Sequence, residues 1–134
     1  MALWIQISIG TGEAVYSQLV SQISQAIAKG QLSAGDKLPP VRKLASELVI
    51  NPNTVAKAYS QLELSGLVVT KTGSGTYIAD RTERSIDISQ MNILVERIDN
   101  IIARAINLGI KISDLAQIFQ ERLKKFNNQP RNSG

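Results

Sequence analysis

The sequence contains no cysteine and no histidine, and these two absences exclude several kinds of chemistry. Without cysteine there is neither a disulfide framework nor a thiolate metal site. Without histidine the chain lacks the usual general base, the commonest metal ligand and the side chain that titrates near neutral pH. We therefore do not expect direct pH sensing near neutrality, thiol redox sensing or soft-metal sensing.

Membrane and enzyme signatures are missing as well. No apolar run has the length of a membrane span, and the N-terminus lacks a signal-like core, so we expect a cytoplasmic protein. No paired-carboxylate, Ser/His/Asp, phosphate-loop or metal-ligand spacing is present, which argues against an enzyme, a metal site or a cofactor. The formal net charge of +4 is divided evenly between residues 1–79 and 80–134. Charge alone therefore does not point to a nucleic-acid partner.

What the sequence does contain is a pattern of two short helices between residues 38 and 66. Apolar residues at helical spacing predict a first helix opened by Pro39. A second helix follows after a short turn, with Asn51 as its N-cap and Pro52 at its first position, and Gly66 ends it. The pair is a candidate helix-turn-helix, whose second helix can lie in a DNA major groove.

A hairpin is predicted directly after these helices. Residues 67–71 and 76–78 form its strands around the glycine-rich turn 72–75, in the manner of a wing. The loop 33–38 is predicted to contribute a short strand that pairs with this wing. An amphipathic helix over residues 14–29 should pack against the two later helices. Residues 3–9 are interpreted as either a short strand or an arm.

Several short motifs lie along this segment. They are Gly35-Asp36-Lys37-Leu38-Pro39, Arg42, Asn51-Pro52-Asn53-Thr54-Val55, Gly66-Leu67 and Gly73-Ser74-Gly75-Thr76-Tyr77. With them, the stretch from about residue 16 to 78 resembles the DNA-binding domain of the GntR family of bacterial transcription regulators. The Asn-Pro-Asn-Thr-Val run and the short C-terminal part are similar to the YtrA-type subfamily. Val49 departs from the pattern, because relatives often carry glycine between the two helices.

The candidate DNA contacts are polar residues predicted on the outward face of this domain. They are Arg42, Asn51, Asn53, Thr54, Lys57, Lys71, Thr72 and Gly73. Arginine can hold a phosphate or reach guanine O6 and N7, asparagine can pair with an adenine edge, and a threonine methyl can meet thymine. The resemblance supports Arg42 as a DNA contact.

Several of these assignments have an ordinary structural alternative. Asn51 could be purely an N-cap, and Arg42 and Lys57 could be solvated surface residues. The glycines of the turn 72–75 could serve only the hairpin.

The chain changes character after a polar linker, residues 80–88. A helix from about residue 89 to 108 carries apolar residues at a heptad-like spacing. A second helix, predicted to be capped by Ser113, runs to about residue 126, and residues 127–134 are a predicted flexible tail. Neither helix can bury its apolar face alone.

We interpret residues 89–126 as a dimerisation region. The predicted interface residues are Met91, Leu94, Ile98, Ile101, Ile102, Ala105, Leu115 and Phe119. Pairing with a second copy would bury both stripes and would suit a symmetric operator. The resemblance also implies a homodimer through this region. The alternative is that the two helices fold back on the DNA-binding domain.

Together these features predict an α+β chain: a winged helix-turn-helix DNA-binding domain over residues 1–79, followed by a short two-helix dimerisation region. The predicted function is a sequence-specific transcription regulator, a repressor that binds an inverted repeat of double-stranded DNA. A small-molecule effector at the C-terminal helices would act through the linker by changing how the two DNA-binding domains are spaced. The alternative function is a winged-helix module for protein or RNA contact.

Overall fold

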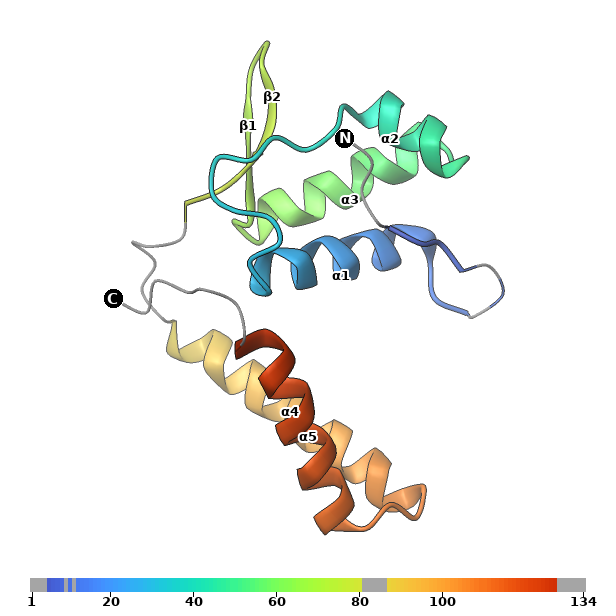
Figure 1. The fold of residues 1–134 in the computed structure, drawn as a ribbon, viewed down its shortest axis with the longest axis vertical. Helices are drawn as coiled ribbons and strands as arrows, with labels where there is room; N and C mark the ends of the chain where they lie inside the picture. The colour runs from blue at the N-terminus through green and yellow to red at the C-terminus, as the bar shows by residue number, and fades with distance from the viewer. Residues whose placement is uncertain (1–4, 9, 11, 81–86, 128–134) are drawn as a thin grey trace. The chain divides into compact units, whose positions relative to one another are not determined.

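The computed structural model describes residues 5–8, 10, 12–80 and 87–127, which form five helices and a two-stranded sheet (Figure 1). The chain divides into two compact units, Met1–Arg81 and Thr82–Gly134. Most of the predicted linker, residues 81–86, and most of the predicted tail, residues 128–134, lie outside the described residues. In the part of the chain that is described, no helix combines the length and apolar character that crossing a membrane requires.

The first unit is an α+β winged helix, as predicted. Its elements are α1 (Val15–Ala28), α2 (Val41–Leu48), α3 (Pro52–Leu64), β1 (Val68–Lys71) and β2 (Gly75–Ile78). One hydrophobic core joins all of them, because each helix turns its apolar stripe inward. The largest fully buried side chains are Leu19, Ile23, Leu38, Leu44, Val55, Leu62 and Val68. The predicted amphipathic stripes of the three helices are therefore confirmed.

The wing is an antiparallel hairpin that a third segment joins. Val68 lies opposite Ile78, and Lys71 lies opposite Gly75. The loop before α2 runs along β2: the Leu38 N–H donates to the Thr76 carbonyl at 2.8 Å. The Ile78 N–H donates back to the Asp36 carbonyl, also at 2.8 Å. The predicted pairing of this loop with the wing is confirmed, and it fixes the start of α2 against β2.

The described part of the N-terminal segment, residues 5–8, is an arm that lies along α1. Two glutamines, one turn apart on α1, each pair with the backbone of one arm residue. Gln18 accepts from the Ser8 N–H and donates to the Ser8 carbonyl, both at 2.8 Å. Gln22 does the same for Gln6, at 3.0 and 2.7 Å. Side-chain amides thus satisfy backbone groups that a neighbouring strand would otherwise satisfy.

The second unit consists of α4 (Ile88–Asn107) and α5 (Ile112–Asn127). Asp87 caps α4, since its Oδ1 accepts from the Ser89 hydroxyl at 2.8 Å and from the Ser89 N–H at 2.9 Å. These hydrogen bonds lower the pKa of the Asp87 carboxyl, the hydroxyl contributing most. Residues 87 and 88, placed in the linker by the sequence pattern, therefore form the start of α4.

The predicted N-cap of α5 is wrong by two positions. The helix begins at Ile112, so Ser113 lies inside its first turn. The reason is that the Leu115 N–H already closes a helical hydrogen bond on the Lys111 carbonyl, at 2.9 Å. The first turn also contains Asp114, whose negative charge suits the positive end of the helix dipole.

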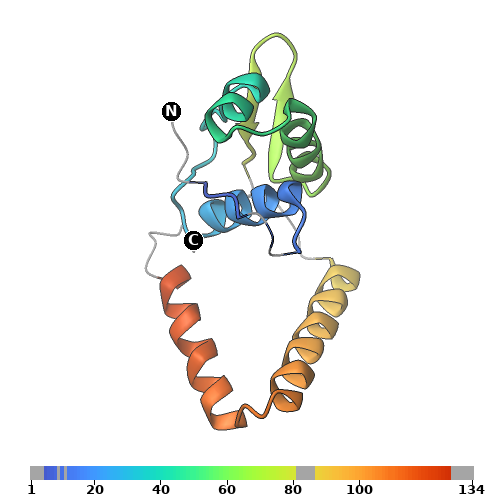
Figure 2. The same cartoon turned by 90° about the vertical axis from the view of Figure 1, so that its right-hand side faces the viewer.

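The apolar faces of α4 and α5 are largely uncovered within one chain. The two helices diverge from their connection, so they contact each other over only a short length (Figure 2). Ala105 is buried, but Ile101 is 62 % exposed and Phe119 is 54 % exposed. Exposed apolar surface of this extent marks an interaction site.

Four helices end with the same backbone arrangement, but one of them uses an unusual residue. Gly30, Gly66 and Gly109 end α1, α3 and α4 in the left-handed region, with φ between 76° and 91°. Val49 ends α2 in the same region, at φ 56° and ψ 51°. In each case the next N–H bonds back five residues; for α2 it is Ile50 to the Ala45 carbonyl, at 3.0 Å. A β-branched side chain is strained there, so the departure from glycine at Val49 carries a conformational cost.

We predict that Val49→Gly stabilises the protein. The Val49 side chain is 88 % exposed, so its removal loses little packing. Relief of the left-handed strain should raise the free energy of unfolding by about 1 kcal/mol. Urea unfolding at fixed protein concentration measures this value. Val49→Ala is the matched control, because alanine keeps a Cβ and should gain less. A glycine variant no more stable than the alanine variant would contradict the strain.

Candidate nucleic-acid interface

The predicted DNA contacts come from three places in the first unit: the first turn of α2, the first turns of α3, and the wing. All of them are exposed except Thr54, which is half-buried. The wing extends beyond the helices. The tip of the wing lies on one side of α3, and α1 lies on the other side (Figures 1 and 2). The structure therefore leaves the start of α2, the start of α3 and the wing uncovered by α1.

A buried hydrogen bond fixes the start of α2. The Tyr59 hydroxyl, on the inner face of α3, donates to the Pro39 carbonyl at 2.7 Å. Burial raises the pKa of Tyr59, so the phenol remains protonated and remains a donor. Arg42 follows three residues after Pro39, on the exposed side of α2. Its backbone is thereby held at a fixed place relative to α3.

Asn51 caps α3. Its Oδ1 accepts a hydrogen bond from the Asn53 N–H at 2.8 Å, and Pro52 occupies the first helical position. The cap that the sequence predicted is therefore confirmed. It commits this oxygen of Asn51 to the helix, while Asn53 projects from the first turn with its side chain exposed. Of these two asparagines, Asn53 has an exposed side chain that takes no part in the cap.

Lys57 makes a contact that the sequence analysis did not anticipate. Its Nζ lies 3.9 Å from the centre of the Tyr16 ring, which belongs to α1. Such a cation–π pair holds the ammonium at the α1 side of α3. The ammonium can still donate to a phosphate on the side away from the ring. The sequence predicted the amphipathic helix over residues 14–29 that carries Tyr16, but not this contact with Lys57.

A groove lies between the start of α2 and the wing. Its volume is about 390 Å³. Residues 37–41 line one side, residues 70–76 line the other, and Tyr59 also contributes to its wall. The groove therefore separates the start of α2 from the outer part of the wing.

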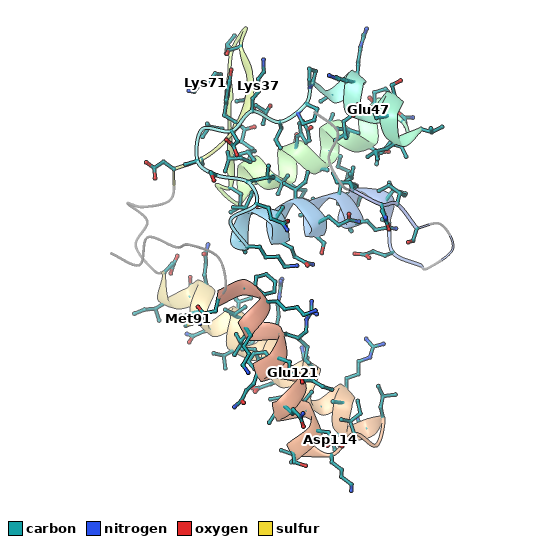
Figure 3. All side chains as sticks on the ribbon, in the orientation of Figure 1. Lys37, Glu47, Lys71, Met91, Asp114 and Glu121 are labelled. Atoms are coloured by element: carbon teal, nitrogen blue, oxygen red, sulfur yellow. The ribbon has the colours of Figure 1, made fainter. Side chains whose placement is uncertain are left out.

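Lys37, like Tyr16, was not among the candidate residues chosen from the sequence. It lies beside the wing together with Lys71 (Figure 3). The Nζ of Lys71 is 4.8 Å from the centre of the Tyr77 ring, and the Nζ of Lys37 is 6.0 Å from it. The position of Lys37 could have been inferred from the predicted pairing of residues 33–38 with the wing, because directly paired strand residues lie on the same face of a sheet.

Comparison with known proteins places the first unit in a known family of regulators. The model of the bacterial regulatory proteins of the gntR family matches residues 15–78. The HTH-type transcriptional repressor YtrA of Bacillus subtilis (strain 168) is 35 % identical over 117 residues, covering 87 % of this chain and 90 % of that protein.

Two solved structures are similar to the chain beyond that unit. The crystal structure of a transcriptional antiterminator from Listeria monocytogenes EGD-e has a TM-score of 0.86 and 28 % identity, and the match covers 99 % of this chain and 98 % of that one. YtrA from Sulfolobus acidocaldarius, a GntR-family transcription factor, has a TM-score of 0.59 and 33 % identity. That match covers 70 % of this chain and 95 % of the other.

We predict that Lys57 and Tyr16 are energetically coupled in the folded protein. A double-mutant cycle with Lys57→Met and Tyr16→Leu should give a coupling free energy of about 0.5–1 kcal/mol, as expected for an exposed cation–π pair. Urea unfolding of the four proteins measures it. Tyr16→Phe is the control, because phenylalanine retains a ring and should retain most of the coupling. A coupling of zero would show that Lys57 is simply solvated.

Proposed function

The chain belongs to the GntR family of bacterial regulatory proteins, and from this membership we propose that it is a repressor that binds an inverted-repeat operator as a homodimer. The family consists of transcription regulators rather than enzymes. The repressor role is supported by the name of YtrA of Bacillus subtilis, which the chain matches over most of its length.

One observation carries the DNA-binding proposal: the first unit exposes the capped N-terminus of α3, Arg42 at the start of α2, and the wing. A helix start of this kind suits the major groove, where its first side chains meet base edges. In this arrangement Arg42 is assigned to guanine, Asn53 to adenine and the Thr54 methyl to thymine. Lys57 and the wing residues Lys71, Thr72 and Gly73 are assigned to the backbone, and Asn51 positions the helix.

The homodimer proposal rests on the uncovered faces of the second unit. The predicted interface residues on α4 include Met91, Leu94 and Ile98, and each is more than a third exposed. A two-fold dimer buries one such face against its own copy, which matches the symmetry of an inverted repeat. Ala105 is the one predicted interface residue that is buried within the chain, and Leu115 is half-buried.

RNA binding is the second candidate, because one of the similar structures is named a transcriptional antiterminator. The geometry favours DNA. The major groove of an A-form helix is deep and narrow, so it does not admit a helix such as α3. A competition experiment separates DNA binding from RNA binding. At equal concentration, an unlabelled DNA duplex should displace the bound DNA duplex, whereas an RNA duplex of the same sequence should not.

We expect a selection from random DNA to enrich an inverted repeat whose half-sites lie about one helical turn apart. On the enriched sequence, Arg42→Ala should weaken binding by about 5- to 150-fold, which is about 1–3 kcal/mol, and relax the preference at one base pair of each half-site. Fluorescence anisotropy measures the affinity. Lys111→Ala, which removes an equal charge from the second unit, should leave it unchanged. A selection that enriches no sequence would refute specific binding.

We also predict that Ile98→Lys with Ile101→Lys splits the dimer, because two ammonium groups cannot be buried unpaired in an apolar interface. Sedimentation velocity should then show monomers. Asn100→Lys is the matched control, since position 100 lies on the opposite face of α4 and should leave the dimer intact. A parent protein that is a folded monomer at micromolar concentration would contradict the proposal.

A further inference from the structure

An arginine interrupts the apolar face of α5. Apolar residues alternate at spacings of three and four along this helix, in a row formed by Ile112, Leu115, Phe119 and Phe126. Arg122 occupies the place between the last two, three residues after Phe119 and four before Phe126. Residues at these spacings share one face of a helix, so Arg122 lies on the face that a partner would cover.

An acidic residue lies at the edge of the apolar face of α4. Asp99 follows Val95 by four residues and precedes Ile102 by three, so these two apolar residues flank it one turn away on either side. Val95 is 47 % exposed and Ile102 is 38 % exposed. Asp99 and Arg122 are exposed as well. A partner that covers these apolar residues therefore also draws the two charges out of water.

Asp99 is the carboxylate of the second unit that is best placed to meet Arg122. Glu96 lies on the side of α4 opposite its apolar face, because a helix has 3.6 residues per turn. Glu121 precedes Arg122 on α5 itself, and successive residues of a helix do not face each other. Asp114 lies in the first turn of α5, and Asp87 caps α4 through its Oδ1.

The two residues lie at similar distances from the connection between the helices. Asp99 is eight residues before the end of α4, and Arg122 is ten residues after the start of α5. At 1.5 Å per residue these positions are about 12 and 15 Å along their helices. Both are near the middle of a helix. A second copy can therefore bring its own Asp99 level with Arg122 in either a parallel or an antiparallel arrangement.

The arrangement of α4 and α5 favours a pair between two copies over a pair within one chain. The helices diverge from their connection and contact each other over only a short length (Figure 2). An arginine buried in an apolar interface without a partner is costly, and a carboxylate that meets it offsets this cost. Such a pair contributes little net stability, but a single polar position in an apolar row can select the register of pairing.

We propose that Arg122 of one copy pairs with Asp99 of a second copy, and that this pair fixes the register of the dimer. The inference rests on the proposed homodimer and supplies the charged contact within its apolar interface. Two-fold symmetry makes the pair twice, because each copy offers both residues to the other. The partner that fits this surface is therefore another copy of this chain, whose charges complement its own.

The test reverses one charge at a time in the full chain. Asp99→Arg should raise the Kd of the dimer by at least about 100-fold, because two like-charge contacts replace two pairs. Arg122→Asp should do the same with carboxylates. When the two variants are mixed in equal amounts they should form a heterodimer, since every arginine then meets an aspartate. Native mass spectrometry distinguishes this heterodimer from either homodimer by its mass.

Two matched controls reverse charges elsewhere on the same helices. Glu96→Arg and Lys124→Asp lie on the faces opposite the apolar stripes, and each should leave the Kd of the dimer nearly unchanged. The mixture is its own control for folding, because variants that regain the dimer together are able to fold.

Three results would overturn the proposed pair in different ways. If Asp99→Arg with Arg122→Asp in one chain restores the dimer but the mixture does not, the pair forms within a chain. If neither reversal weakens the parent dimer, the pair is absent and the proposed homodimer stands. If the parent is a monomer at micromolar concentration, the homodimer itself is refuted.

Discussion

The burial of one face of α3 is the constraint on which the rest of the first unit depends. Val55, Ala58 and Leu62 are completely buried, and Tyr59 nearly so, which fixes the rotation of the helix about its axis. A helix has 3.6 residues per turn, so burying these positions turns the opposite face of α3 outward. Asn53, in the first turn of α3, lies on that outward face. The same inner face supplies the Tyr59 hydroxyl that holds the start of α2. The core thus decides which side chains of α3 face outward.

Most of this unit could be predicted from the sequence because its signals are local. Helical spacing, the Asn51-Pro52 start and the glycine-rich turn each depend on neighbouring residues, and the structure agrees with them. The contacts of Lys57 with Tyr16 and of Lys37 with Tyr77 join residues far apart in the chain. A pattern can place such lysines on an outer face, but the direction of a long flexible side chain depends on tertiary neighbours.

The helix ends show the same division between local and non-local information. Gly66 correctly predicted the end of α3, whereas the left-handed turn at Val49 could be inferred only from the position of glycine in relatives. The sequence suggested Ser113 as the cap of α5 because serine is a good N-cap in many contexts. The helix instead begins earlier, since the Leu115 N–H bonds to the Lys111 carbonyl.

The two units differ in how their apolar surface is satisfied. The first closes a core within one chain, while α4 and α5 leave most of theirs exposed. If a second copy covers it, the stability of the second unit depends on protein concentration, and dimerisation sets the spacing of the two DNA-binding domains. An effector bound between the C-terminal helices would then act by favouring one spacing, provided that it binds the two arrangements with different affinity.

In the proposed complex, two copies of α3 enter successive major grooves on one side of a DNA duplex. Hydroxyl-radical footprinting on the enriched sequence tests it most directly, because backbone protection reports where each copy lies. We expect two equivalent patches of protection, related by two-fold symmetry and about one helical turn apart on the same face. A single patch, or protection without symmetry, would contradict it.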